Sequence, residues 1–183
     1  MTNNINAQEN IISYTKIFLV GPMGVGKTTI GKGLAKKLGF DFFDVDHIIE
    51  ERCGANVAWV YDLEGPDGFQ KREEKIIDEY TQKSNLVLAT GGNAVLSQIC
   101  RDCLTSRGYV VYLSAPLDRL LQRTEFDRKR PQLQTDEKDL IMEKLLIESI
   151  PHYQSVANLT VRTDQMSVAK IIQTIVDAIS QQI

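Results

Sequence analysis

The sequence predicts a three-layer α/β fold, in which helices cover both faces of a parallel β-sheet. Short, near-continuous apolar runs indicate strands buried on both faces, and helical patterns alternate with them along the chain. Such alternation is typical of parallel strands joined by right-handed crossovers. The expected strands are 17–20, 40–43, 86–89, 109–113 and 159–161. The expected helices are 29–38, 47–52, 69–82, 94–106, 117–125, 137–149 and 168–183.

Glycine and proline mark several of the expected helix ends. Gly39 and Gly108 follow helical patterns, where glycine commonly ends a helix. Pro66 suits the first turn of a helix. The chain has 183 residues and shows neither an internal repeat nor a linker. We therefore expect a single domain over residues 15–183, preceded by a flexible polar tail over residues 1–14.

Composition and charge argue against several classes of function. The net charge is −3, so no broadly basic surface indicates nucleic-acid binding. No apolar run approaches the roughly 20 residues that would span a bilayer. Residues 1–13 lack the basic start and apolar middle of a signal peptide, and the three cysteines are an odd number. These features favour a cytoplasmic protein, and we expect it to be a monomer.

A phosphate-binding loop follows the first expected strand. Residues 21–28 read GPMGVGKT, which places glycines at the first and sixth positions, then Lys and a hydroxyl residue. Glycines let successive N–H groups turn toward a phosphate, and the helix start adds further N–H groups and a positive dipole end. The strand before and the helix after this loop favour nucleoside triphosphate binding. The expected cofactor contacts in the loop are Gly24, Val25, Gly26, Lys27, Thr28 and Thr29.

Other segments are expected beside this loop, because ligands of such sheets bind beyond the carboxyl ends of the strands. Asp44 and Asp46 alternate in direction if their strand continues, so one could hold Mg²⁺ through water while the other faces an acceptor alcohol. Asp46 could instead cap a helix that begins at His47. The turn 90–92 lets backbone approach a ligand, and the basic segment 126–135 is typical of a lid.

Together these segments resemble the shikimate kinase family, from about residue 16 to the C-terminus. The family's elements, as they stand in this sequence, are the phosphate loop, Asp44-x-Asp46, Ala58-Trp59, Asp62-Leu63-Glu64-Gly65, Gly68-Phe69 with Glu73-Glu74, Ala89-Thr90-Gly91-Gly92, Arg123-Thr124, Arg130-Pro131 and Arg162-Thr163-Asp164. The resemblance implies a P-loop kinase fold with a five-stranded parallel sheet in the order 2-3-1-4-5. It also implies a substrate-binding segment over about 46–75 and a lid over about 126–135.

The resemblance further implies transfer of the γ-phosphate of ATP to the 3-hydroxyl of shikimate, in the route to chorismate and the aromatic amino acids. Lys27 and Arg130 are expected to contact the phosphates. Mg²⁺ is expected on Thr28 and, through water, on Asp44. Asp46 is expected to bind and activate the acceptor hydroxyl, which makes Lys27, Asp46 and Arg130 the expected catalytic residues. Adenine contacts are implied for Arg123, Arg162 and Gln165.

The acceptor side departs from the family pattern at three positions. Gln70 and Ser149 stand where the family has two arginines that bind the shikimate carboxylate, and Asn93 replaces a third glycine. Asn is the least penalised replacement if that glycine has a left-handed conformation. Lys71 and Arg72 are adjacent cations, but neighbours on a helix point about 100° apart. The expected substrate residues are Asp46, Gln70, Gly91, Gly92, Asn93 and Ser149.

Losing two arginine contacts costs on the order of 3–6 kcal/mol of binding free energy. Three hypotheses accommodate this loss. The first is a kinase for shikimate, or a related polyol acid, with weakened acceptor binding. The second is a P-loop kinase for another small alcohol. The third is a nucleotide-binding relative without kinase activity. The complete set of phosphate, Mg²⁺ and acceptor-hydroxyl positions favours an enzyme, and we take shikimate as the expected acceptor.

Overall fold

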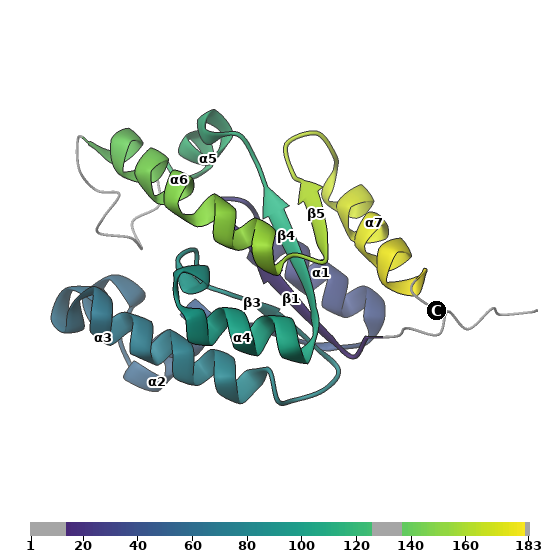
Figure 1. Ribbon diagram of the computed structural model, residues 1–183, viewed down its shortest axis with the longest axis horizontal. Helices are drawn as coiled ribbons and strands as arrows, with labels where there is room; N and C mark the ends of the chain where they lie inside the picture. Colours follow the sequence, from purple (N-terminus) through teal and green to yellow (C-terminus); the bar gives the residue numbers. More distant parts are fainter. Residues whose placement is uncertain (1–13, 126–136, 182–183) are drawn as a thin grey trace, which may run out of the picture.

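A five-stranded parallel sheet forms the centre of the molecule (Figure 1). The computed structural model describes residues 14–125 and 137–181. The strand order is β2-β3-β1-β4-β5, which confirms the expected order. The strands are β1 (Lys16–Val20), β2 (Asp41–Asp44), β3 (Leu86–Ala89), β4 (Tyr109–Ser114) and β5 (Leu159–Arg162). The expected lid, 126–135, lies outside the described residues.

Helices cover both faces of the sheet, as the alternating pattern predicts. On one face α1 and α7 pack beside each other, and on the other face α3, α4 and α6 lie together (Figure 1). The helices are α1 (Lys27–Leu38), α2 (Val45–Cys53), α3 (Val57–Tyr80), α4 (Gln98–Arg107), α5 (Leu117–Arg123), α6 (Lys138–Val156) and α7 (Val168–Ser180), with a 3₁₀ turn η1 (Ala94–Leu96). Within the described residues, no helix combines the length and the apolarity that a membrane span needs.

The central strands supply side chains to two separate cores. In β1, Phe18 packs into the core under α3 and α4, while Ile17 and Leu19 pack into the core under α1 and α7. Successive strand side chains point to opposite faces, so a strand buried on both faces must be apolar throughout. All three of these side chains are fully buried. The phosphate loop is therefore attached to the central strand of the sheet, whose apolar side chains are buried on both faces.

The expected path of the chain after β2 is wrong in one respect. The strand ends at Asp44 and α2 begins at Val45, so Asp46 lies in the first helical turn rather than on a continuing strand. Asp44 is the N-cap, because its Oδ1 accepts a hydrogen bond from the Asp46 backbone N–H at 3.1 Å. The helix cap that we had considered for Asp46 therefore belongs to Asp44. A capping carboxylate satisfies backbone donors that the helix leaves unpaired.

The second half of α3 begins at Pro66, as its helix-start signal predicts, and covers most of the expected helix 69–82, but α3 as a whole is longer. It begins at Val57, where Asn56 Oδ1 accepts from the backbone N–H of Trp59 at 2.8 Å, and it includes the apolar segment before Pro66. The helix is broken at Gly65, which has φ 70° and ψ 178°, a conformation that is open essentially to glycine alone. Tertiary packing of the first half explains why a sequence pattern interrupted by Gly and Pro still forms helix.

Two other helix boundaries also differ from the expected ones. The expected helix 94–106 is divided at Ser97, whose side chain caps α4 by accepting from the Cys100 N–H. Helix α6 continues beyond Pro151 to Val156, whereas the expected helix ended at residue 149. Tyr153 and Val156 are buried in the core, and their packing favours the additional turns despite the proline.

Candidate active site

The phosphate loop joins β1 to α1 and takes backbone conformations that its glycines permit. Gly24 has φ 75° and Gly26, the N-cap of α1, has φ 103°. A Cβ on Gly24 would lie 2.7 Å from Thr124 Cγ2, so both conformation and space require glycine there. The N-terminus of α1 begins directly after this loop and leaves its first N–H groups available to an anion.

The Lys27 side chain lies along the loop from which it comes. Its Nζ donates to the backbone oxygens of Gly21 at 2.6 Å and Pro22 at 3.0 Å. Those carbonyls hold the ammonium at the rim of the loop, next to the start of α1. The position is suited to a point charge that contacts the outer phosphates of a nucleotide.

The side-chain oxygens of Thr28, on α1, and Asp44, at the end of β2, lie next to each other. The Thr28 hydroxyl donates to Asp44 Oδ2 at 2.6 Å. Thr28 is in the first turn of α1 and Asp44 ends β2, so the pair spans the carboxyl edge of the sheet. A hydroxyl and a carboxylate are ligands that Mg²⁺ prefers, and the ion keeps several waters and substrate phosphates besides. The donor set therefore fits Mg²⁺.

A cavity of about 770 Å³ lies over these residues, and we call it the nucleotide cavity. Its volume falls within the usual range of small-molecule sites, about 300–1,000 Å³. It brings together most of the expected nucleotide residues and Asp46. Its lining includes Met23, Gly24, Gly26, Lys27, Thr28, Thr29, Asp44, Asp46, Gly92 and Arg123. Val25 is almost fully buried in the core behind the loop, so its expected contact would come from its backbone.

Arg123 connects the phosphate loop to the loop after β5. Its Nη1 donates to Gly24 O and Val25 O, both at 3.4 Å, and to Thr163 Oγ1 at 3.1 Å, while Nη2 donates to Thr163 O at 3.2 Å. The sequence reasoning did not single out Thr163 as a contact. Arg123 thereby fixes the phosphate loop against the segment 162–165, on which the implied adenine contacts lie.

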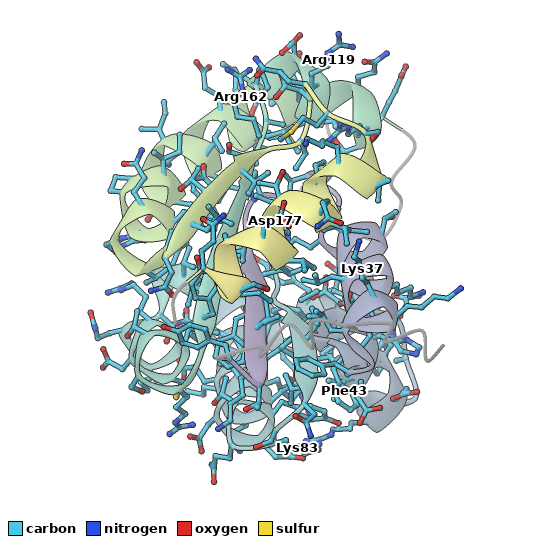
Figure 2. All side chains as sticks on the ribbon, turned by 90° about the vertical axis from the view of Figure 1, so that its right-hand side faces the viewer. Lys37, Phe43, Lys83, Arg119, Arg162 and Asp177 are labelled. Carbon is cyan, nitrogen blue, oxygen red and sulfur yellow. The ribbon has the colours of Figure 1, made fainter. Side chains whose placement is uncertain are left out.

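Arg162 and Gln165 do not line the nucleotide cavity in this structure. The Arg162 guanidinium forms an ion pair with Asp164 at 2.8 Å, and this hydrogen bond lowers the pKa of the Asp164 carboxyl. Figure 2 shows Arg162 near Arg119, at the opposite end of the molecule from Phe43 and Lys83. The adenine contacts of Arg162 and Gln165 stay predictions. Arg130 lies outside the described residues, so its phosphate contact also stays a prediction.

A second, smaller cavity adjoins the nucleotide cavity, and we call it the acceptor cavity. The two share Met23 and Gly92. The acceptor cavity has a volume of about 120 Å³ and is lined by Met23, Tyr61, Pro66, Phe69, Gln70, Glu73, Gly92, Asn93 and Leu96. It therefore lies between the two halves of α3 and the turn that follows β3. Its lining includes residues of the segment 46–75 and of the turn, whose role in acceptor binding stays a prediction.

Gly91 lies against two carboxylates at the junction of the cavities. A Cβ on Gly91 would lie 1.8 Å from Glu73 Oε1 and 3.5 Å from Asp46 Oδ1. Only glycine allows Glu73, on α3, and Asp46, on α2, to approach the turn in this way. Glu73 is 3% exposed, which is unusual for a carboxylate. Sequence reasoning did not include Glu73 among the site residues, although its spacing of three from Gln70 places both on one helix face.

The three departures from the family pattern occupy different environments. Gln70 is exposed at the acceptor cavity, and its Nε2 donates to Glu74 Oε1 at 3.1 Å. Asn93 has φ −100°, so it does not have the left-handed conformation considered for this position. Its backbone conformation is open to residues other than glycine. Ser149 is 2% exposed and faces a separate small cavity that Asn93 and Gly92 also line. Asn93 thus lies between Ser149 and the acceptor cavity.

Tyr153 supports the turn after β3 from the side of α6. Its hydroxyl donates to the Gly92 carbonyl oxygen, and its ring stacks on Tyr112 with centroids 4.9 Å apart. Burial raises the pKa of the Tyr153 phenol, so it stays a hydrogen-bond donor at neutral pH. Sequence reasoning did not identify this contact. The only sequence signal is an aromatic residue two positions after Pro151, which does not reveal its partner.

Comparisons with known proteins agree with this geometry. The sequence profile of the family described as Shikimate kinase matches residues 23–180. A shikimate kinase of Legionella pneumophila (strain Corby) is 46% identical over 167 residues, which are 91% of this chain and 95% of the relative. A shikimate kinase of Vibrio cholerae (strain O395) is 48% identical over 167 residues, covering 91% of this chain and 96% of the relative.

A solved structure is also similar over most of the chain. The structure of shikimate kinase from Acinetobacter baumannii in complex with shikimate superposes with a TM-score of 0.88 at 42% identity. The match covers 92% of this chain and 94% of that one. Sequence profile, relatives and structure point to the same family over nearly the whole domain. The chain therefore belongs to the shikimate kinase family and is an ATP-dependent small-molecule kinase.

Proposed function

We propose that this protein transfers the γ-phosphate of MgATP to the 3-hydroxyl of shikimate, giving shikimate 3-phosphate and ADP. The observation that carries the proposal is the placement of Asp46, which lines the nucleotide cavity and also lies beside the Gly91 turn next to the acceptor cavity. Family membership and the shikimate-bound structure of the Acinetobacter baumannii relative support shikimate as the acceptor.

The nucleotide half supplies positioning and charge. Backbone N–H groups of the loop and of the first turn of α1 bind the phosphates, and Lys27 exchanges its carbonyl contacts for the outer phosphates. Thr28 and Asp44 would hold Mg²⁺, Asp44 through water, and a bound ion would supply positive charge against the outer phosphates. Phosphoryl transfer needs little covalent chemistry from the protein, so this geometry provides most of the catalysis.

The acceptor half orients the attacking hydroxyl. Asp46 accepts the hydrogen bond from the 3-hydroxyl and takes its proton as the new P–O bond forms and ADP leaves. Asp46 Oδ1 and Glu73 Oε1 both lie beside Gly91, at the turn between the two cavities. Arg130 is proposed as the further catalytic residue, with a phosphate contact from the segment 126–135. Loss of negative charge at Asp46 should therefore affect the chemical step more than ATP binding.

A coupled assay of ADP release from MgATP, with and without shikimate, tests this function. Shikimate should raise ADP release well above the basal ATPase rate, and Asp46→Asn should lower that shikimate-dependent rate on the order of 10²-fold. Asp41→Asn is the matched control, because Asp41 is exposed at the opposite end of β2. The proposal is wrong if shikimate does not raise the rate of ADP release at any concentration that the coupled assay allows.

A further inference from the structure

The acceptor cavity lacks positive charge among the residues that the structure describes. None of its lining residues is Lys or Arg, and one of them, Glu73, is a buried acid. The rest are aromatic, apolar or carboxamide side chains. A ligand carboxylate bound here would therefore meet a carboxylate and neutral groups. The inference drawn from this lining rests on the proposed function, since it concerns the acceptor of the same reaction.

The nearest cations on α3 are directed elsewhere. Arg72 donates Nε and Nη2 to the two carboxylate oxygens of Glu64, at 2.6 and 2.5 Å. This bidentate hydrogen bond raises the pKa of Arg72 and lowers that of Glu64, so both stay charged and paired. Lys71 is exposed and does not line the cavity. Neither cation can replace an arginine at position 70 without rotation of the helix or loss of the ion pair across Gly65.

Two carboxamides contribute neutral polar groups to the cavity instead. Gln70 donates one N–H of its amide to Glu74. The second N–H and the amide oxygen remain to donate to and accept from a ligand. Asn93 adds a second amide at the wall beside Gly92. The Ser149 hydroxyl faces the separate cavity behind Asn93, which is lined by apolar side chains such as Met142 and Leu146. The arrangement offers neutral donors and acceptors together, and that combination suits hydroxyl and carbonyl groups.

We propose that the acceptor cavity recognises an uncharged polyol end, so that this protein does not select for a carboxylate on its acceptor. The reacting hydroxyl is still bound by Asp46, while the far end of the acceptor binds Gln70 and Asn93. Neutral hydrogen bonds are weaker than bonds between a guanidinium and a carboxylate, by roughly tenfold in binding for each contact. The substrate class is therefore a cyclic polyol whose charge at that end contributes little to affinity.

Steady-state kinetics with shikimate and its uncharged methyl ester test the proposal. In the native protein, the two values of kcat/KM should agree within about threefold, since no cation among the described residues lines the acceptor cavity. Gln70→Arg should shift the ratio toward the acid by about tenfold or more. Gln82→Arg adds the same charge at an exposed position beyond α3 that does not line the cavity, and should leave the ratio unchanged.

Calorimetric titration of both compounds into the protein with bound ADP gives the same comparison without turnover. A native preference for the acid of about thirtyfold or more, by either method, overturns the proposal. So does failure of both compounds to bind. If both bind equally and neither is phosphorylated, the proposed function fails while the charge preference stands. If shikimate is phosphorylated and the ester is not bound, the proposed function stands and this inference fails.

Discussion

The nucleotide half and the acceptor half of the site are built in different ways. The nucleotide half combines backbone groups, from a glycine loop and a helix N-terminus, with the Thr28–Asp44 pair of side chains. The acceptor half consists of side chains from α2, α3 and the turn after β3, with Tyr153 of α6 behind them. A site made of backbone groups keeps its geometry only if the local fold is kept. A site made of side chains can change by single substitutions. Of the three departures that the resemblance implies, Gln70 and Asn93 line the acceptor cavity and Ser149 lines the small cavity beside it.

Removing the Lys27 ammonium should have the largest effect and should be confined to the nucleotide half. Lys27→Ala is expected to lower ATP turnover on the order of 10²- to 10³-fold, because one preorganised charge on the transferring phosphate is lost. It should also weaken MgATP binding in calorimetry. Lys36→Ala, on the exposed side of α1, is the control. Equal MgATP affinity of native and Lys27→Ala protein would contradict the assignment of the phosphate loop.

Restoring cations to the acceptor half is expected to give the next largest effect. Gln70→Arg with Ser149→Arg should raise kcat/KM for shikimate by on the order of 10²-fold or more, with most of the change in KM. Each single change should recover less than half of that free energy, because the two arginines act on one carboxylate.

The structure adds a condition to this second prediction. An arginine at position 149 must pass Asn93 to reach the acceptor cavity, since Ser149 faces the cavity behind it. Asn93→Gly added to the double variant should therefore increase the gain further. A native KM for shikimate already in the micromolar range would show that other groups bind the carboxylate.

Tyr153→Phe tests whether the acceptor turn depends on support from α6. The change keeps the ring and its stacking on Tyr112 but removes the hydrogen bond to the Gly92 carbonyl. We expect the KM for the acceptor to rise about tenfold while the KM for ATP changes little, because the turn shifts and the phosphate loop does not. Tyr112→Phe removes a hydroxyl that bonds to none of the described residues, and serves as the control. Equal changes in both KM values would indicate general destabilisation instead.

The smallest expected effect is a difference in stability between alanine substitutions at two glycines, Gly65 and Gly39, which have different backbone conformations. A Cβ on either Gly65 or Gly39 would have no atom within 4 Å, so neither substitution by Ala creates a clash. Gly39 has ψ 30°, which Ala tolerates at modest cost, whereas Gly65 has ψ 178°. Gly65→Ala should lower the free energy of unfolding by about 1 kcal/mol more than Gly39→Ala. Urea denaturation measures the difference, and equal losses would show that the break in α3 relaxes.

The sequence predicted the fold and the nucleotide half more fully than the acceptor half, for physical reasons. Continuous apolar strands and the loop pattern are local signals, and they predict the strand order through known topology and the position of Lys27 through spacing. The contacts of Tyr153 and Glu73 depend on elements far apart in the chain. No local pattern indicates that α6 and α3 approach the same turn from opposite sides.

Element boundaries failed where a short-range signal competed with packing. Gly65 and Pro66 predict a helix start, and the second half of α3 does begin there, but no local signal predicted the first half, in which Val57 and Val60 are buried in the core. Asp46 is a residue type that commonly caps helices. The cap is nevertheless Asp44, two residues earlier, because β2 ends there. Arg162 forms an ion pair with Asp164 and does not line the nucleotide cavity here, and its adenine contact, which the resemblance implies, stays a prediction.

The position of β2 at the edge of the sheet bears on how the site responds to heat. Strand β2 pairs with β3 on one side, and none of its four residues is buried, whereas β1 is paired on both sides and buried. Elements with fewer buried contacts open locally at lower free energy than the centre of a domain. Asp44 ends this strand and Asp46 follows it, so bound MgATP and acceptor would suppress that opening by mass action. Substrates would then protect the sheet edge from proteolysis far more than they protect the phosphate-loop strand.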